Sequence, residues 1–312
     1  MHIQGTVDVM IHISSAFDGG NIEVVSANNA DDIQLRIQKD NASEFFQWFY
    51  FRVSGAREKV CRIRLINAGE ASYADGFYDY KACMSEDLRN WRRVETSYDG
   101  KELTISYKPS SDSFYIAFFA PYSLDQQRRF IARCQRNPLA SLEVIGHSVE
   151  GRDLDLLVIG SSGASKKVCW AIARQHPGET MGCFWMEGFL SRLLDPVDTV
   201  ALKVRESAVF YIVPNMNPDG SARGNLRTNA AGANLNREWA KPSKSRSPEV
   251  LAVRNRMVET GVDFCLDVHG DETIPYNFIA GADHVPGVPG GVCHRQADDG
   301  RHCRWFRHAR RR

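Results

Sequence analysis

The sequence predicts two domains: an N-terminal antiparallel β-sandwich, followed by an α/β domain whose mixed sheet is mainly parallel. From about residue 20 to residue 120 the apolar residues alternate with period two, whereas beyond Ser123 short apolar strands alternate with helices. The chain has 312 residues, 43% of them hydrophobic, so it is long enough to bury two cores. We expect the sandwich at residues 1–122, the α/β domain at 123–286 and an irregular basic tail at 287–312.

The predicted sandwich rests on five apolar runs of strand length. Turn residues such as Ser54-Gly55 and Asp99-Gly100 separate many of these runs, as is typical of antiparallel strands. The predicted strands cover residues 33–37, 45–53, 60–66, 103–107 and 114–119.

The predicted α/β domain begins with a helix. Ser123 and Gln126 have the spacing of a capping box, and Asn137-Pro138 ends the helix that follows. Further strands are predicted at residues 155–159, 168–173, 208–213 and 264–268, and further helices at 181–194 and 248–260. In such sheets ligands bind beyond the carboxyl ends of the strands, so functional residues are expected there.

Composition and charge exclude several classes of function. The net charge is +1, so no overall field favours nucleic acid, and no apolar run approaches the roughly 20 residues of a membrane span. The first basic residue is Arg36, so the N-terminus lacks the charged start of a secretory signal, and we expect a cytoplasmic protein. The eight cysteines include no Cys-x-x-Cys pair and are expected to be reduced thiols.

Two of the predicted strands lead into potential metal ligands. His176 and Glu179 follow the strand at residues 168–173, and His269 follows the strand at 264–268. A His-x-x-Glu pair alone is as readily a polar turn before a helix. With a second histidine at the same sheet edge, it supplies the nitrogen and oxygen ligands that a catalytic zinc takes, and we expect one Zn²⁺ per chain.

The residues around this predicted zinc site leave other assignments open. Asp267 and Asp271 flank His269, where each could orient the imidazole or simply face solvent. A second His-x-x-Glu pair, His147 and Glu150, precedes the strand at residues 155–159. We expect that pair at the opposite, amino edge of the sheet and away from any metal.

Three arginines offer an anion site. Arg223, Arg227 and Arg237 carry a planar guanidinium that binds carboxylates bidentately and stays charged. Close to zinc, such a group suits an anionic substrate or a developing oxyanion. A solvated surface position is the alternative for each arginine, and it is favoured for Arg223.

These elements together resemble the zinc metallocarboxypeptidases, because they occur in the order and approximate spacing of that family. The resemblance covers about residues 1–285, and three further segments are similar to the cytosolic carboxypeptidase-like subgroup. The family motif residues are His176, Glu179, Arg227, Asn236, Arg237 and His269, and the subgroup segments are Gln47 to Val53, Glu150 to Leu154 and Asp267 to Glu272.

The resemblance implies a role for each motif residue. His176, Glu179 and His269 would bind zinc, and Arg227 would polarise the scissile carbonyl and hold its oxyanion. Asn236 and Arg237 would bind the terminal carboxylate of a peptide or protein substrate, whose C-terminal peptide bond is hydrolysed by zinc-activated water. Asn234 stands where many relatives have Asp, a departure that we expect to matter little.

The resemblance also implies a general-base glutamate on a later strand, and the sequence has no such residue there. Residues 287–312 show neither helical nor strand periodicity and are rich in arginine. We therefore expect a shifted reading frame or a premature stop, with a basic arm for nucleic acid or acidic partners as the alternative. Glu272 is the carboxylate available as a substitute base, but by family precedent it lies on the wrong side of the strand end.

Two other functions remain open at the level of sequence. An amidohydrolase acting on N-acyl amino acids would share the His-x-x-Glu pair and the distant histidine, although the sandwich domain favours the peptidase. A protein without the general base would bind zinc or a peptide terminus without cleaving it.

Overall fold

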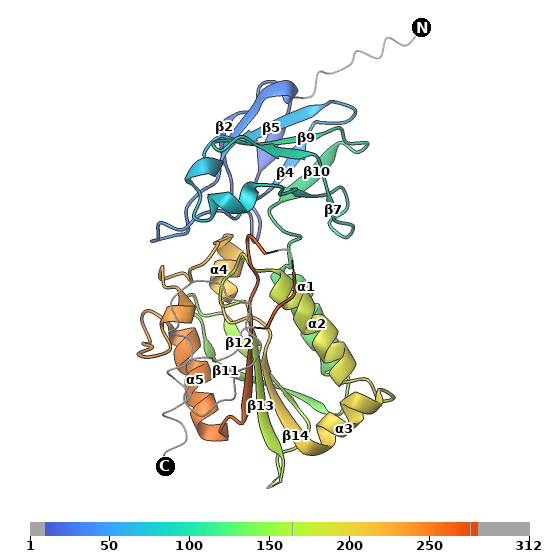
Figure 1. Ribbon diagram of the computed structural model, residues 1–312, viewed down its shortest axis with the longest axis vertical. Coiled ribbons are helices and arrows are strands. Elements are labelled where there is room, and N and C mark those ends of the chain that lie inside the picture. The colour runs from blue at the N-terminus through green and yellow to red at the C-terminus, as the bar shows by residue number, and fades with distance from the viewer. Residues whose placement is uncertain (1–9, 164, 275, 280–312) are drawn as a thin grey trace.

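The computed structural model describes residues 10–163, 165–274 and 276–279, which form three five-stranded sheets and the helices around them. Two sheets belong to the N-terminal part of the chain, and the third belongs to the part that follows (Figure 1). The predicted tail at residues 287–312 lies outside the described residues, as do the last seven residues of the predicted α/β domain.

The N-terminal part confirms the predicted sandwich of antiparallel sheets, with one parallel pair, β3 with β5. Inward-facing residues alternate along β3 and β5, as the period-two pattern requires. One sheet has the order β1 (His12–Ser14), β4 (Tyr50–Ser54), β10 (Ser113–Ala117), β6 (Cys83–Ser85) and β7 (Arg92–Arg93). The other has the order β2 (Glu23–Ser26), β3 (Ile33–Arg36), β5 (Cys61–Leu65), β9 (Leu103–Tyr107) and β8 (Thr96–Tyr98).

One predicted strand is shorter than expected, because residues 45–49 form a buried loop and β4 begins only at Tyr50. Side chains satisfy part of the backbone of this loop and of the segment beside it. The amide of Phe46 donates to Ser72 Oγ at 2.9 Å, and the Gln47 side chain bonds both backbone groups of Tyr73. Apolar periodicity cannot distinguish such a loop from a strand.

The helices of the second part agree with the predicted ones where the sequence carried a clear start signal. Ser123 caps α1 (Leu124–Cys134) by accepting a hydrogen bond from the amide of Gln126 at 3.0 Å. The remaining helices of this part are α2 (Met181–Leu193), α3 (Thr199–Ser207), α4 (Pro218–Arg223) and α5 (Pro248–Thr260), together with the short 3₁₀ turn η4 (Leu235–Arg237). The N-terminal part has the 3₁₀ turns η1 (Ala30–Asp32), η2 (Ala68–Glu70) and η3 (Ala74–Phe77).

The third sheet is mixed and mainly parallel, as predicted. β13 runs parallel to β14 and β15, whereas β12 runs antiparallel to both of its neighbours, β11 and β14. Four strands therefore share one direction and only β12 opposes them. The strand order is β11 (Ala140–His147), β12 (Asp153–Ile159), β14 (Ala208–Val213), β13 (Lys167–Ala173) and β15 (Phe264–Val268).

Helices cover both faces of this sheet, with α1, α2 and α3 on one side and α5 on the other (Figure 1). Successive strand residues pack into two separate cores, so that Ala171 faces α2 while Trp170 and Ile172 face α5. The carboxyl ends of β11, β13, β14 and β15 point toward the N-terminal sheets. There α4, which directly follows β14, lies next to the sandwich, and the amide of Gly19 bonds the Ala222 carbonyl at 2.7 Å.

The direction of β12 corrects one sequence-based expectation. Because β12 is antiparallel to β14, its amino end and the carboxyl end of β11 lie at the same edge as the carboxyl ends of β13, β14 and β15. His147 ends β11, so it does not lie at the opposite edge from His176 and His269. The expectation was wrong because it took the strand after His147 to be parallel to the others.

No helix within the described residues combines the length and the apolar character that crossing a lipid bilayer requires.

Candidate active site

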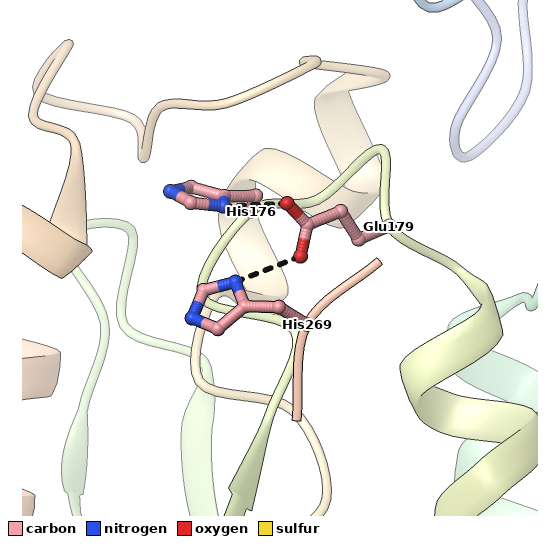
Figure 2. Close-up of side chains that lie close together, drawn as sticks. All are labelled: His176, Glu179 and His269. Atoms are coloured by element: carbon pink, nitrogen blue, oxygen red, sulfur yellow. Dashed lines mark hydrogen bonds and ion pairs between the residues drawn. The ribbon is translucent and has the colours of Figure 1, made fainter. Parts of the chain in front are cut away.

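Three side chains converge where β13 and β15 end. His176 and Glu179 lie in the turn after β13, and His269 follows β15, whose last residue, Val268, pairs with Ala173 of β13. One potential ligand atom from each of the three residues lies within 4.8 Å of the others (Figure 2). Among the residues that the structure describes, this is the only such group of three His, Cys, Asp or Glu side chains.

Glu179 lies between the two imidazoles. Its Oε1 is 2.7 Å from Nδ1 of His176, and its Oε2 is 2.9 Å from Nδ1 of His269, as Figure 2 shows. The amide of Gly270 donates to the same Oε2 at 2.8 Å. Burial acts to raise the pKa of Glu179, but the two histidines together hold it far below its usual range, so the group is a carboxylate. Two imidazole nitrogens and a carboxylate form a donor set suited to zinc.

The second nitrogen of each imidazole also has a partner. Nε2 of His176 is 3.0 Å from Oδ1 of Asn234, and Nε2 of His269 is 3.0 Å from Oδ2 of Asp267. Each of these oxygens can accept an N–H on the far side of the ring and so orient the imidazole, with Nδ1 of each histidine facing Glu179. Sequence reasoning foresaw the contact of Asp267 as one of two alternatives, but it did not foresee the contact of Asn234.

Two further side chains extend the network behind Asp267. The buried amide of Gln175 donates to Oδ2 of Asp267 at 2.6 Å and accepts from Nε1 of Trp239 at 2.8 Å. Asp271, the other carboxylate next to His269, instead accepts hydrogen bonds from Thr273 and Ile274 in its own turn. Of the two acidic neighbours, Asp267 is therefore the one that contacts the imidazole.

The turn that carries His176 and Glu179 is fixed at both ends. Arg174, in the left-handed region at φ 57°, is buried and donates to the carbonyl oxygens of Tyr122 and Pro177 at 2.8 and 3.0 Å. The amide of Gly178 donates to the carbonyl of Leu226 at 2.9 Å. A Cβ at Gly178 would lie 3.0 Å from that carbonyl oxygen, so glycine allows the close approach.

Arg227 lies in the loop after α4, which bonds to the turn of the cluster, because the carbonyl of its neighbour Leu226 accepts from the amide of Gly178. Burial lowers the pKa of His176, and the positive charge of Arg227 acts in the same direction. The guanidinium carbon is 5.6 Å from the ring centre of Phe45 and 5.5 Å from that of Tyr73. Both rings belong to the N-terminal part, which sequence reasoning had not connected with this arginine.

The other predicted anion-binding residues have different surroundings. Asn236 and Arg237 lie in η4, which is capped by Asn234 next to His176, and Arg237 is exposed. Arg223 forms an ion pair with Glu150, with its Nε at 2.8 Å from the carboxylate. This exposed pair agrees with the surface position favoured for Arg223.

The second His-x-x-Glu pair, His147 and Glu150, does not form a metal-ligand cluster, although it lies at the same sheet edge as His176. Nδ1 of His147 is 3.1 Å from Asp153, and the histidine side chain is 62% exposed. Glu150 points to Arg152 and Arg223 instead. Side-chain partners, and not sheet polarity, separate this pair from His176 and Glu179.

Two further carboxylates have surroundings that the sequence did not predict. Asp219 is fully buried and accepts hydrogen bonds from Ser148 Oγ at 2.7 Å and from Arg152 at 2.7 Å, which ties the β11–β12 turn to α4. Burial raises the pKa of Glu272 to about 7, and the negative charge of Glu179 adds to this effect.

Comparison with known proteins identifies the two parts of the chain. Residues 13–119 match the N-terminal domain of cytosolic carboxypeptidases, and residues 129–280 match the zinc carboxypeptidase family. The chain is 49% identical to a metallo-carboxypeptidase of Burkholderia cenocepacia of known structure, with a TM-score of 0.87, over 89% of this chain and 75% of that one.

Two curated relatives extend the comparison. An uncharacterised protein of Zymomonas mobilis is 51% identical over 88% of this chain and 72% of its own length. Cytosolic carboxypeptidase 2 of Danio rerio is 30% identical over 82% of this chain, which spans only 40% of that relative's length. The chain therefore belongs to the zinc carboxypeptidase family and carries the N-terminal domain of its cytosolic carboxypeptidase members.

Proposed function

We propose that this protein is a zinc-dependent metallocarboxypeptidase that hydrolyses the C-terminal peptide bond of a peptide or protein. The observation that supports this most directly is the convergence of His176, Glu179 and His269 at the end of two parallel strands. The loop of Arg227 bonds to the turn that carries the first two of them. We assign the three converging residues as ligands of one Zn²⁺. When bound, the ion would polarise the scissile carbonyl and make a water molecule more acidic.

The donor set fits this ion. Glu179 is ionised and almost completely buried, and each histidine turns Nδ1 toward it while its Nε2 has an oxygen partner. Imidazole nitrogens and a carboxylate oxygen are the ligands that zinc takes in hydrolytic enzymes, and hydrogen bonds on the far side of each imidazole orient the ring. The surrounding hydrogen bonds thus support a preorganised site.

The remaining residues would bind and orient the substrate. Arg227 would donate to the carbonyl oxygen and stabilise the negative charge that develops on it. Asn236 and Arg237 would bind the terminal carboxylate, for which a planar guanidinium is well shaped. Binding the terminal carboxylate beside the scissile bond would confine cleavage to the last residue of the chain.

The names of the relatives supply the proposed setting. The Danio rerio relative is named as a cytosolic enzyme, and we propose that this chain also acts in the cytoplasm, on peptide or protein C-termini. We also propose that the two domains divide at residues 122 and 123, between the two matched regions.

Zinc content and peptide hydrolysis, measured on the same preparation, test the proposal. We expect one zinc per chain by elemental analysis and release of the C-terminal residue from a peptide with a free terminus. The same peptide with an amidated terminus should be cleaved far more slowly, because Asn236 and Arg237 would lose their ionic partner. Equal turnover of the two peptides would contradict the exopeptidase assignment. Hydrolysis of an N-acyl amino acid alone would indicate the amidohydrolase, and zinc without hydrolysis a binding protein.

A further inference from the structure

The N-terminal domain bonds directly to the loop that carries Arg227. Asn21 donates to the carbonyl of Gly224 at 2.9 Å, and Asn41 donates to the carbonyl of Ala230 at 2.6 Å. Between these two bonds, Oδ1 of Asn41 also accepts from the side chain of Asn225 at 2.7 Å, and Asp40 bonds the backbone of the loop. The loop at residues 224–230 is therefore held along its length by the domain that precedes the α/β part.

Asp40 makes the central contact between the N-terminal domain and this loop. Its carboxylate accepts hydrogen bonds from the amides of Leu226, Arg227 and Thr228 at 2.6, 2.8 and 2.9 Å, and from Oγ1 of Thr228 at 3.0 Å. The side chain is only 3% exposed, and burial raises its pKa despite these hydrogen bonds. Three successive amides can point at one carboxylate only if the backbone curls around it, so Asp40 fixes the backbone at Arg227.

The side chain of Arg227 is held by the same domain. The rings of Phe45 and Tyr73 lie 5.6 and 5.5 Å from its guanidinium carbon, within the range of cation–π contact. Two aromatic neighbours restrict the directions in which a long side chain can extend. Backbone and guanidinium are thus positioned independently, both by residues of the N-terminal domain.

The loop also touches the turn of the metal cluster. The amide of Leu226 donates to Asp40, and the carbonyl of Leu226 accepts from Gly178, which lies between His176 and Glu179. A short hydrogen-bonded path therefore runs from Asp40 through one residue of the loop into the turn that presents two of the proposed ligands.

We propose that Asp40 is a positioning residue of the active site, which sets Arg227 between Phe45 and Tyr73 and beside the metal cluster. The N-terminal domain would then complete the active site instead of only flanking it. The inference rests on the proposed function for the task of Arg227, namely stabilising the oxyanion. The position of Arg227 itself can be measured without any turnover.

The first experiment measures that position in the full chain. In Asp40→Ala we expect hydrogen exchange at the amides of Leu226, Arg227 and Thr228 to become at least about tenfold faster, because their common acceptor is lost. Asn21→Ala is the matched control, since it removes a buried bond to the same loop two residues earlier. In Asp40→Asn, which preserves shape and one acceptor oxygen, we expect an intermediate rate, and this variant replaces alanine if Asp40→Ala does not fold.

The second experiment follows the guanidinium. The NMR signal of Nε–H of Arg227 should be shifted by the two aromatic rings and should move in Asp40→Ala. Tyr73→Leu should move the signal as well, whereas Tyr73→Phe, which keeps the ring, should restore it. A purely structural role of Asp40 would lower stability without this selective change.

The third experiment connects position with catalysis. Misplacing an oxyanion donor should lower kcat of Asp40→Ala by about 10-fold to 100-fold, with KM for the peptide and zinc content nearly unchanged. Binding of a phosphinic peptide, which imitates the tetrahedral oxyanion, should weaken by a similar factor. Exchange rates and an Arg227 signal in Asp40→Ala that match the Asn21→Ala control would overturn the proposal. A wild-type chain that does not hydrolyse peptides would contradict the proposed function, while the exchange and NMR results would still decide the role of Asp40.

Discussion

His176 and Asn234 face each other, with Nε2 of the imidazole 3.0 Å from Oδ1 of the amide. The same oxygen accepts the amide hydrogen of Asn236 at 3.2 Å and begins η4. One neutral side chain therefore orients a proposed zinc ligand and starts the turn that carries the proposed carboxylate-binding residues. A position that the sequence presented as a minor departure from the family lies next to the metal cluster.

Replacing Asn234 should lower zinc affinity only when the new side chain lacks an oxygen that accepts a hydrogen bond from His176. In Asn234→Leu the imidazole loses the oxygen that fixes its tautomer, and we expect zinc affinity to fall about 10-fold to 100-fold. Asn234→Asp keeps the acceptor and the cap, and it should bind zinc at least as tightly as the wild type. Competition with a fluorescent chelator measures both constants. Wild-type affinity in Asn234→Leu would show that the contact does not orient the ligand.

The two His-x-x-Glu pairs should respond differently to alanine. His176→Ala removes one of three converging donors, so we expect zinc to fall from one per chain to near zero by elemental analysis. His147→Ala is the matched control, because His147 ends β11 at the same sheet edge but contacts Asp153 and is largely exposed. It should retain full zinc. Loss of zinc only in His147→Ala would reverse the site assignment.

The sequence predicted the elements of the α/β part more reliably than their directions. The runs at residues 208–213 and 264–268 are strands with those same bounds, because a short apolar run of strand length indicates a strand. The direction of β12 depends on its pairing with β14, a tertiary contact that periodicity does not encode. His147 was therefore assigned to the wrong edge.

The site residues were likewise predicted in part: the metal-ligand candidates were found from the sequence, and the contacts between the domains were not. Chain order was sufficient to bring His176, Glu179 and His269 together as candidates, because parallel strands end at one edge. The contacts of Asp40, Phe45 and Tyr73 with the loop of Arg227 connect positions about 150 to 190 residues apart, between two domains. Such contacts depend on how the domains pack, and a lone aspartate in a polar stretch gives no local signal of burial.

Asp219 should be far more important for stability than its position in a turn sequence suggests. It is fully buried and accepts hydrogen bonds from Arg152, from Ser148 Oγ and from the amide of Glu150. Asp219→Asn removes the buried charge that holds these donors together and leaves Arg152 only its ion pair with Glu150. We expect a loss of about 3 kcal/mol in the free energy of unfolding, measured by urea denaturation. Asp125→Asn removes the exposed pair with Arg129 and should cost less than about 0.5 kcal/mol. Equal losses would contradict a special role of the buried carboxylate.

Glu249 should make stability depend on pH. This side chain of α5 is fully buried beside Asn229, and burial, reinforced by the charge of Asp219, raises its pKa from 4.5 to about 7. Because the pKa is higher in the folded state, the protonated carboxyl contributes its full stability at pH values below 4.5, the pKa of the unfolded state. This contribution is lost as the pH rises through about 7, the pKa of the folded state. Stability of the wild type should therefore decline by about 3 kcal/mol on account of this group between pH 4.5 and 7.

Glu249→Gln stays neutral at every pH and should lack this decline. Urea unfolding of both proteins at about pH 5 and about pH 8 isolates the effect as a difference of differences, because all other titrating groups are shared. We expect the variant to gain about 2 to 3 kcal/mol on the wild type between the two conditions. A difference near zero would mean that Glu249 is ionised in the folded protein throughout this range, stabilised by Asn229 and the nearby backbone amides more strongly than burial disfavours it.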